Sequence, residues 1–127
     1  MTSRILVDSC ILINFLRQKE KSKTLFYKLS KEHLLQVSII THTELYAGKS
    51  AWTKRGKKDL ETIFGGLTLI PITESISESA GKLRASLSVD LIDALIASTA
   101  IQNKLPLATL NLKHFKGIPD LQILSID

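Results

Sequence analysis

Three acidic residues of this chain stand among apolar neighbours, where a carboxylate is costly to bury. Asp8 follows the apolar run ILV, Glu44 lies within THTEL, and Asp93 lies within LIDALIA. Like charges crowded into one site raise one another's pKa, and a divalent cation removes that conflict. Mg²⁺ binds through one or two carboxylates together with phosphate oxygens and water. These residue types therefore indicate metal-assisted attack on a phosphate ester.

Each acid also has a purely structural explanation as a helix-capping residue. Asp8 can cap the helix that follows it, Thr41 and Glu44 have the spacing of a capping box, and Asp93 favours a helix N-terminus by its charge. Taken together these explanations weaken, because helices that follow parallel strands all begin at the same edge of the sheet. Small residues beside Glu44 and Asp93 on their helices also leave room for a ligand.

The elements that must position these acids alternate between strands and helices. We predict strands over 5–8, 34–38, 67–72 and 105–109, with 121–126 as a candidate fifth, and helices over 9–16, 24–31, 52–64, 74–87 and 90–103. A further helix ends at Gly48 and begins near either Ser38 or Thr41. This alternation predicts an α/β domain with a mainly parallel sheet of about five strands, covered by helices on both faces.

The length and composition bound the class of protein. The 127 residues suffice for one domain with a buried core, and we treat residues 1–127 as a single domain. The apolar stretches are far shorter than the roughly 20 residues that span a bilayer, and we expect neither a membrane partner nor a signal peptide. One cysteine, Cys10, cannot form an internal disulfide and fits a reducing cytoplasm, so we expect a cytoplasmic protein.

The net charge of +5 makes a polyanionic partner plausible. The densest basic cluster, KRGKK at 54–58, can be read as a backbone contact for nucleic acid or as a solvated helix face. We prefer the second interpretation, because phosphate contacts should lie nearer the acids.

In their order along the chain, these features resemble the PIN-domain ribonucleases, and within them the VapC toxins of type II toxin–antitoxin modules. The resemblance runs from residue 4 to about residue 124 and is carried by Asp8-Ser9 after the first strand, TEL around Glu44, DALIASTA from Asp93 and TLNLKHF from Thr109. It implies a three-layer α/β/α fold and Mg²⁺- or Mn²⁺-dependent endoribonuclease activity on RNA. It also implies a cognate VapB-type antitoxin, and a toxin homodimer or a toxin–antitoxin hetero-oligomer.

The resemblance also implies roles for individual residues. Asp8, Glu44 and Asp93 take the positions of the catalytic, metal-binding acids. Ser9 matches the small hydroxyl residue that supports the first acid. Asp90, one helical turn before Asp93, is a further candidate ligand, with helix capping as the alternative that we prefer.

This chain departs from the family pattern where many relatives carry a fourth acid. Asn111 and His114 occupy those positions, which leaves open whether one ion or two would bind. Asn111 could contact a phosphate or orient a water held by the metal. Lys113 and His114 follow the fourth strand and are candidate RNA contacts, and His114 has a second interpretation as a general acid.

The antitoxin of such a toxin docks near the first and third helices, where apolar anchors suit a helix-in-groove contact. Trp52 is the best candidate for an exposed anchor, whereas Leu12 and Leu16 fit an ordinary core. Two other functions remain open, a housekeeping PIN nuclease of RNA processing and a catalytically inactive module that binds RNA or protein. The short single domain favours the toxin, and the three acids argue against the inactive module.

Overall fold

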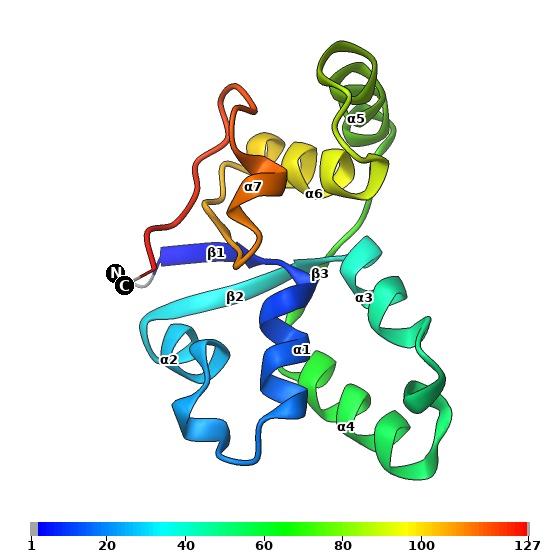
Figure 1. Ribbon diagram of the computed structural model, residues 1–127, viewed down its shortest axis with the longest axis vertical. Helices are drawn as coiled ribbons and strands as arrows, with labels where there is room; N and C mark the ends of the chain where they lie inside the picture. Colours follow the sequence, from blue (N-terminus) through cyan, green and yellow to red (C-terminus); the bar gives the residue numbers. More distant parts are fainter. Residues whose placement is uncertain (1–2, 127) are drawn as a thin grey trace.

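A parallel sheet lies at the centre of the computed structural model, which describes residues 3–126 (Figure 1). Its four strands are β1 (Ser3–Val7), β2 (His33–Ser38), β3 (Thr68–Ile70) and β4 (Leu107–Ala108), in the order β3-β2-β1-β4. All three strand pairs are parallel. The first strand is therefore interior, with a neighbour on each side.

The sequence of β1 explains its central place. Ile5, Leu6 and Val7 are each 0% exposed, as expected for a strand buried on both faces. Successive side chains of a strand point to opposite faces. Accordingly, Ile5 and Val7 belong to one hydrophobic core and Leu6 to the other.

Helices cover both faces of the sheet, which confirms the predicted three-layer α/β/α arrangement. One face carries α1 (Ser9–Arg17), α2 (Leu25–Glu32) and α4 (Lys54–Gly65), whose apolar side chains share the core of Ile5 and Val7. The other face carries α6 (Leu91–Gln102) and the short α7 (Leu112–Phe115), which share the core of Leu6. In Figure 1, α5 (Glu74–Leu87) lies outside α6, farthest from the sheet.

The remaining elements connect these layers. Helix α3 (Ile39–Tyr46) follows β2 at the edge where the strands end. Two short 3₁₀ turns, η1 (Lys21–Lys23) and η2 (Lys49–Trp52), precede α2 and α4. None of the helices within residues 3–126 is both long and apolar enough to cross a membrane.

The predicted fifth strand is much shorter than expected. Residues 121–126 form only an isolated parallel bridge between Leu107 and Ile123. Two backbone hydrogen bonds of 2.8 Å join Leu107 to Gln122 and Leu124. Because β4 is only two residues long, it offers little backbone for further pairing.

The strand order also fixes where a ligand site can form. From β1 the chain moves outward through β2 to β3 and then returns to place β4 on the other side of β1. At such a reversal, the crevice outside the carboxyl ends of the strands is where open α/β sheets bind ligands. Asp8 follows β1 and Thr109 follows β4, so both stand at this edge.

Candidate functional site

Asp8 is the most firmly held acid of the site. It is 5% exposed, and both of its oxygens accept hydrogen bonds. The backbone N–H of Ser9 donates to Oδ1 at 2.8 Å, and the Thr109 hydroxyl donates to Oδ2 at 2.8 Å. The first bond is the cap of α1, so the capping explanation is correct for Asp8, and the second is a contact across the sheet edge.

Thr109 takes part in the site although the sequence predicted no role for it. Thr109 is 2% exposed, and its hydroxyl also accepts a 3.0 Å hydrogen bond from the backbone N–H of Asn111. It therefore links Asp8 to the segment that begins α7. Its position could have predicted this role, because Thr109 comes directly after the last strand, at the carboxyl edge of the sheet.

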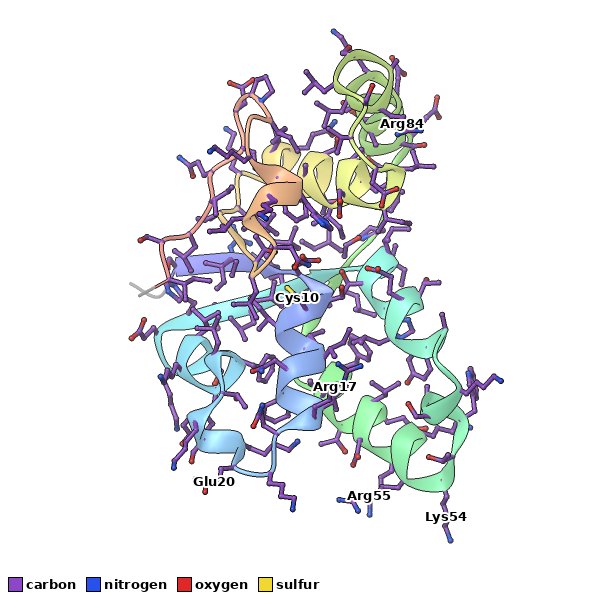
Figure 2. All side chains as sticks on the ribbon, viewed as in Figure 1. Cys10, Arg17, Glu20, Lys54, Arg55 and Arg84 are labelled. Carbon is purple, nitrogen blue, oxygen red and sulfur yellow. The ribbon has the colours of Figure 1, made fainter. Side chains whose placement is uncertain are left out.

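Cys10 joins the same two segments. Its Sγ accepts a 3.3 Å hydrogen bond from the backbone N–H of Leu110 and lies 3.5 Å from Oδ2 of Asp8. Figure 2 labels Cys10 near the start of α1, beside the sheet. Burial raises the pKa of the Cys10 thiol, the nearby Asp8 charge raises it further, and the Leu110 N–H opposes both. The thiol is therefore a hydrogen-bonding group and not an activated nucleophile.

Glu44 reaches the site from α3. The capping-box explanation for it was wrong, because α3 begins at Ile39 and its N-cap is Ser38, whose hydroxyl accepts from the Ile40 N–H at 3.1 Å. Partial loss of hydration raises the pKa of Glu44, the charges of Asp8 and Asp93 raise it further, and the Ser9 hydroxyl opposes them. The structure thus brings the three predicted acids within electrostatic reach of one another.

Asp93 stands in the first turn of α6, with 16% of its side chain exposed. Loss of hydration raises the pKa of Asp93, and the charges of Asp90 and Asp8 add to this effect. His114 acts in the opposite direction, because its Nδ1 lies 3.1 Å from Oδ2 of Asp93. This pairing of an acid with the histidine of α7 was not predicted.

Asp90 occupies the N-cap position of α6, which agrees with the preferred interpretation of this residue. Its side chain, however, makes no capping hydrogen bond. It is exposed, and its charge raises the pKa of both Glu44 and Asp93. Asp90 therefore contributes negative charge to the rim of the site.

The fourth-acid positions lie on α7, a four-residue helix that the sequence did not predict. Asn111 is its N-cap residue, and its side chain makes no capping hydrogen bond. Asn111, Lys113 and His114 are exposed, and of these His114 contacts Asp93 directly. This edge of the molecule combines a cluster of carboxylates with a lysine and a histidine.

The donor set of the site suits a hard cation. Among residues 3–126, no three carboxylate, thiol or imidazole side chains are close enough together to enclose an ion unaided. Mg²⁺ does not need such a cage, because it keeps several waters and binds through one or two carboxylates plus substrate phosphate. Loss of hydration is the main cause of the raised pKa values of Glu44 and Asp93, and the charges of neighbouring acids add a repulsion that a cation would relieve.

The region proposed for a partner contains one well-exposed aromatic residue. Trp52 is 63% exposed, and its Nε1 donates a 2.8 Å hydrogen bond to the Tyr46 carbonyl. The ring is thereby held in place although it faces solvent. Leu12 is fully buried, as predicted for a core residue, whereas Leu16 is only half-buried.

Comparisons with known proteins agree with this fold. Residues 5–121 match the PIN domain family. Ribonuclease VapC10 of Mycobacterium tuberculosis is 33% identical over 123 residues, which cover 93% of this chain and 90% of the relative. Ribonuclease VapC of Rickettsia bellii is 30% identical over 134 residues, which cover 96% of each chain.

Solved structures lead to the same family. VapBC2 from Rickettsia felis, bound to a DNA fragment from the promoter, superimposes with a TM-score of 0.81 at 26% identity, covering 98% of this chain and 99% of that chain. A toxin–antitoxin complex from Klebsiella pneumoniae gives a TM-score of 0.76 at 29% identity, covering 92% and 94%. With a family match over most of its length and curated relatives of the same size, the chain belongs to the PIN-domain family, in its VapC-like toxin branch.

Proposed function

We propose that this protein is a metal-dependent endoribonuclease that acts as the toxin of a type II toxin–antitoxin module. The observation that carries the proposal is the electrostatic coupling of Asp8, Glu44 and Asp93 at the edge where the sheet order reverses. Relatives that match over nearly the whole chain are named ribonucleases, which supports the same substrate class.

In the proposed mechanism, Asp8, Glu44 and Asp93 would hold Mg²⁺ or Mn²⁺. Such an ion would make a water more acidic and would stabilise the charge that develops on the phosphate. The chain itself orients these acids: Ser9 N–H and Thr109 fix both oxygens of Asp8, and His114 holds Asp93. This preorganisation keeps the carboxylates in place before substrate arrives.

The rim residues would bind the RNA backbone. Lys113 lies exposed on the short helix α7 and Asn111 lies exposed at its N-cap, where either could hold a phosphate next to the cleaved bond. The net charge of +5 favours a polyanion over the rest of the surface. The acidic centre would repel RNA unless a cation were bound, which makes binding of RNA and of metal mutually supportive.

A VapB-type antitoxin is the proposed protein partner. The structural neighbours include VapBC complexes, and the exposed Trp52 offers an aromatic anchor of the kind that dominates interfaces. We further propose that the toxin works as a homodimer or within a toxin–antitoxin hetero-oligomer in the cytoplasm.

The direct test is cleavage of total cellular RNA by the purified protein, with Mg²⁺, with Mn²⁺ and with EDTA. The proposal expects defined fragments that require metal and disappear in the Asp8→Asn and Asp93→Asn variants. Glu78→Gln, an exposed residue of α5, is the matched control and should cleave normally. Circular dichroism must show that the variants are folded. Absence of cleavage by the folded wild-type protein with metal present would refute the nuclease.

A further inference from the structure

Two exposed leucines stand beside the acids of the candidate site. Leu110 is 52% exposed and Leu112 is 55% exposed. A single exposed leucine is ordinary on a protein surface. This pair, however, lies between Thr109 and His114, the two residues that reach across to acids of the site. The apolar side chains are therefore next to the place where the phosphodiester is proposed to be cut.

The backbone that carries the leucines is held in place. The Leu110 N–H donates to Sγ of Cys10 at 3.3 Å, and the Asn111 N–H donates to the Thr109 hydroxyl at 3.0 Å. The His114 N–H donates to the Asn111 carbonyl at 3.0 Å. Because this backbone is already ordered, a ligand that contacts the two leucines pays little to order the chain.

The charges around the leucines suit a polyanion. Residues 109–119 contain Lys113, His114 and Lys116 and no acidic residue, and both lysines are exposed. The acids of the neighbouring site would be offset by the cation of the proposed function. Two copies of the chain that met through this segment would bring like charges together, whereas an RNA backbone would neutralise them. The charges therefore favour RNA over a second copy as the occupant.

This segment lies away from the region where the antitoxin is expected. Phe115 of α7 belongs to the core of Leu6, on one face of the sheet, whereas α1 packs in the core of Ile5 and Val7 on the other face. Figure 1 shows α7 beside α6. Trp52, the proposed anchor for the antitoxin, lies on η2, between α3 and α4. The two leucines are therefore separate from that anchor.

We propose that Leu110 and Leu112 pack against an unpaired base of the RNA, beside the phosphodiester that is cut. Apolar side chains cover the faces of bases that are taken out of a stack, and leucine can also separate neighbouring bases. Asn111 and Lys113, at the alternate positions, are left for the adjoining phosphates. This contact rests on the proposed ribonuclease function and adds to it a preference for single-stranded RNA.

Truncation of each leucine tests the contact. Leu110→Ala and Leu112→Ala should each raise the Kd for single-stranded RNA about fivefold, because roughly half of each side chain is still open to burial. Leu110→Tyr should lower the Kd, since an aromatic ring stacks well on any base. Leu34→Ala is the matched control and should leave the Kd unchanged. Leu34 is 56% exposed and pairs with Arg4, near the start of β1 and away from the acids.

Binding is measured by fluorescence anisotropy in Mg²⁺ with a short labelled RNA of mixed sequence, both as a single strand and as a duplex. The Glu44→Gln background removes one proposed metal ligand without altering the segment of the leucines, and a gel confirms that the RNA stays intact. The alanine variants should weaken binding of the single strand and not of the duplex, whose bases are stacked and out of reach. The salt dependence should stay the same, because no charge is lost.

The outcomes separate this inference from the function on which it rests. Unchanged affinity for the single strand in both folded alanine variants overturns the contact, even if the wild-type protein cleaves RNA. Equal weakening for the duplex also overturns it, and so does dissociation of a dimer by the variants in size-exclusion chromatography, which would assign the leucines to a contact between copies. Conversely, a wild-type protein whose binding depends on the leucines as expected but that cuts no RNA would retain the contact and refute the nuclease.

Discussion

Nδ1 of His114 lies 3.1 Å from Oδ2 of Asp93, so the short helix α7 holds the acid in the first turn of α6. The histidine stands at one of the two positions where the family resemblance led us to expect a further acid. At this position the chain therefore has an imidazole that donates a hydrogen bond to the Asp93 carboxylate, and not a further carboxylate that would add negative charge.

Removal of this contact should change the titration of Asp93. Burial raises the pKa of Asp93 and His114 lowers it, so His114→Ala should raise that pKa further. Carboxyl ¹³C NMR of the metal-free protein would measure the shift. His33→Ala is the control, since His33 pairs with Ser3 at the opposite end of β1. A lower or unchanged pKa in His114→Ala would contradict the role of His114.

Neutralising Glu44 should stabilise the metal-free protein. The raised pKa of Glu44, caused by lost hydration and by Asp8 and Asp93, means that the folded chain binds this proton more tightly than the unfolded chain. Stability is then lost as the pH rises from the ordinary glutamate range through the raised pKa of the folded state. Glu44 is an exposed side chain whose charge is partly screened by solvent, so Glu44→Gln should raise the Tm in EDTA at pH 7.5 by only a small amount.

The same comparison at low pH and with metal tests the cause. Below about pH 4 the advantage of Glu44→Gln should shrink, because the wild-type carboxyl is then protonated in both states. Added Mg²⁺ or Mn²⁺ should stabilise the wild-type protein more than the variant, since a ligand of the folded state raises the Tm by mass action. A Tm for Glu44→Gln in EDTA that is equal to or below the wild-type value would count against repulsion among the acids.

Thr109 should matter through its hydroxyl and not its size. Thr109→Val keeps the shape but removes the donor to Asp8 and the acceptor for the Asn111 N–H in a buried setting. Urea unfolding should show a loss of about 1–3 kcal/mol, the usual cost of buried groups left without partners. Thr109→Ser retains the hydroxyl and should recover most of the RNA cleavage; equal activity of the two variants would be the adverse result.

Substitution by alanine should change the stability of the protein in opposite directions at two glycines that lie in helices. Gly56→Ala brings a methyl group against the Ser50 carbonyl and should destabilise the protein by about 1 kcal/mol or more, in spite of the better helix propensity of alanine. Gly81→Ala meets nothing within 4 Å and should stabilise by about 0.5–1 kcal/mol. Thermal unfolding of both variants is sufficient, and stabilisation by Gly56→Ala would show that η2 can move away from α4.

Much of the fold could be predicted because its signals are local. The apolar run before Asp8 predicts the central strand, and the alternation of strands and helices predicts a parallel sheet with helices on both faces. The four-residue helix α7 could not be found in this way, because it is shorter than the period of an amphipathic pattern. Residues 121–126 have strand-like composition, but pairing depends on the length of β4, which composition does not reveal.

The acids of the candidate site could be predicted from the sequence, but the residues that hold those acids in place could not. Asp8, Glu44 and Asp93 stand out because a carboxylate in apolar sequence is unusual, and the structure brings them within electrostatic reach. The contacts of Thr109 with Asp8 and of His114 with Asp93 join segments that are far apart along the chain. Such pairings follow from the strand order, which local patterns do not contain.

The hydrogen bond from Thr109 to Asp8 spans 101 residues, and it has a consequence for synthesis. Asp8 leaves the ribosome early, whereas β4, Thr109 and α7 belong to the last quarter of the chain. A nascent polypeptide that ends before residue 105 carries all three acids, yet β1 has one open edge and Asp8 lacks its second donor. A chain that ends before residue 105 therefore lacks both the Thr109 contact to Asp8 and the His114 contact to Asp93.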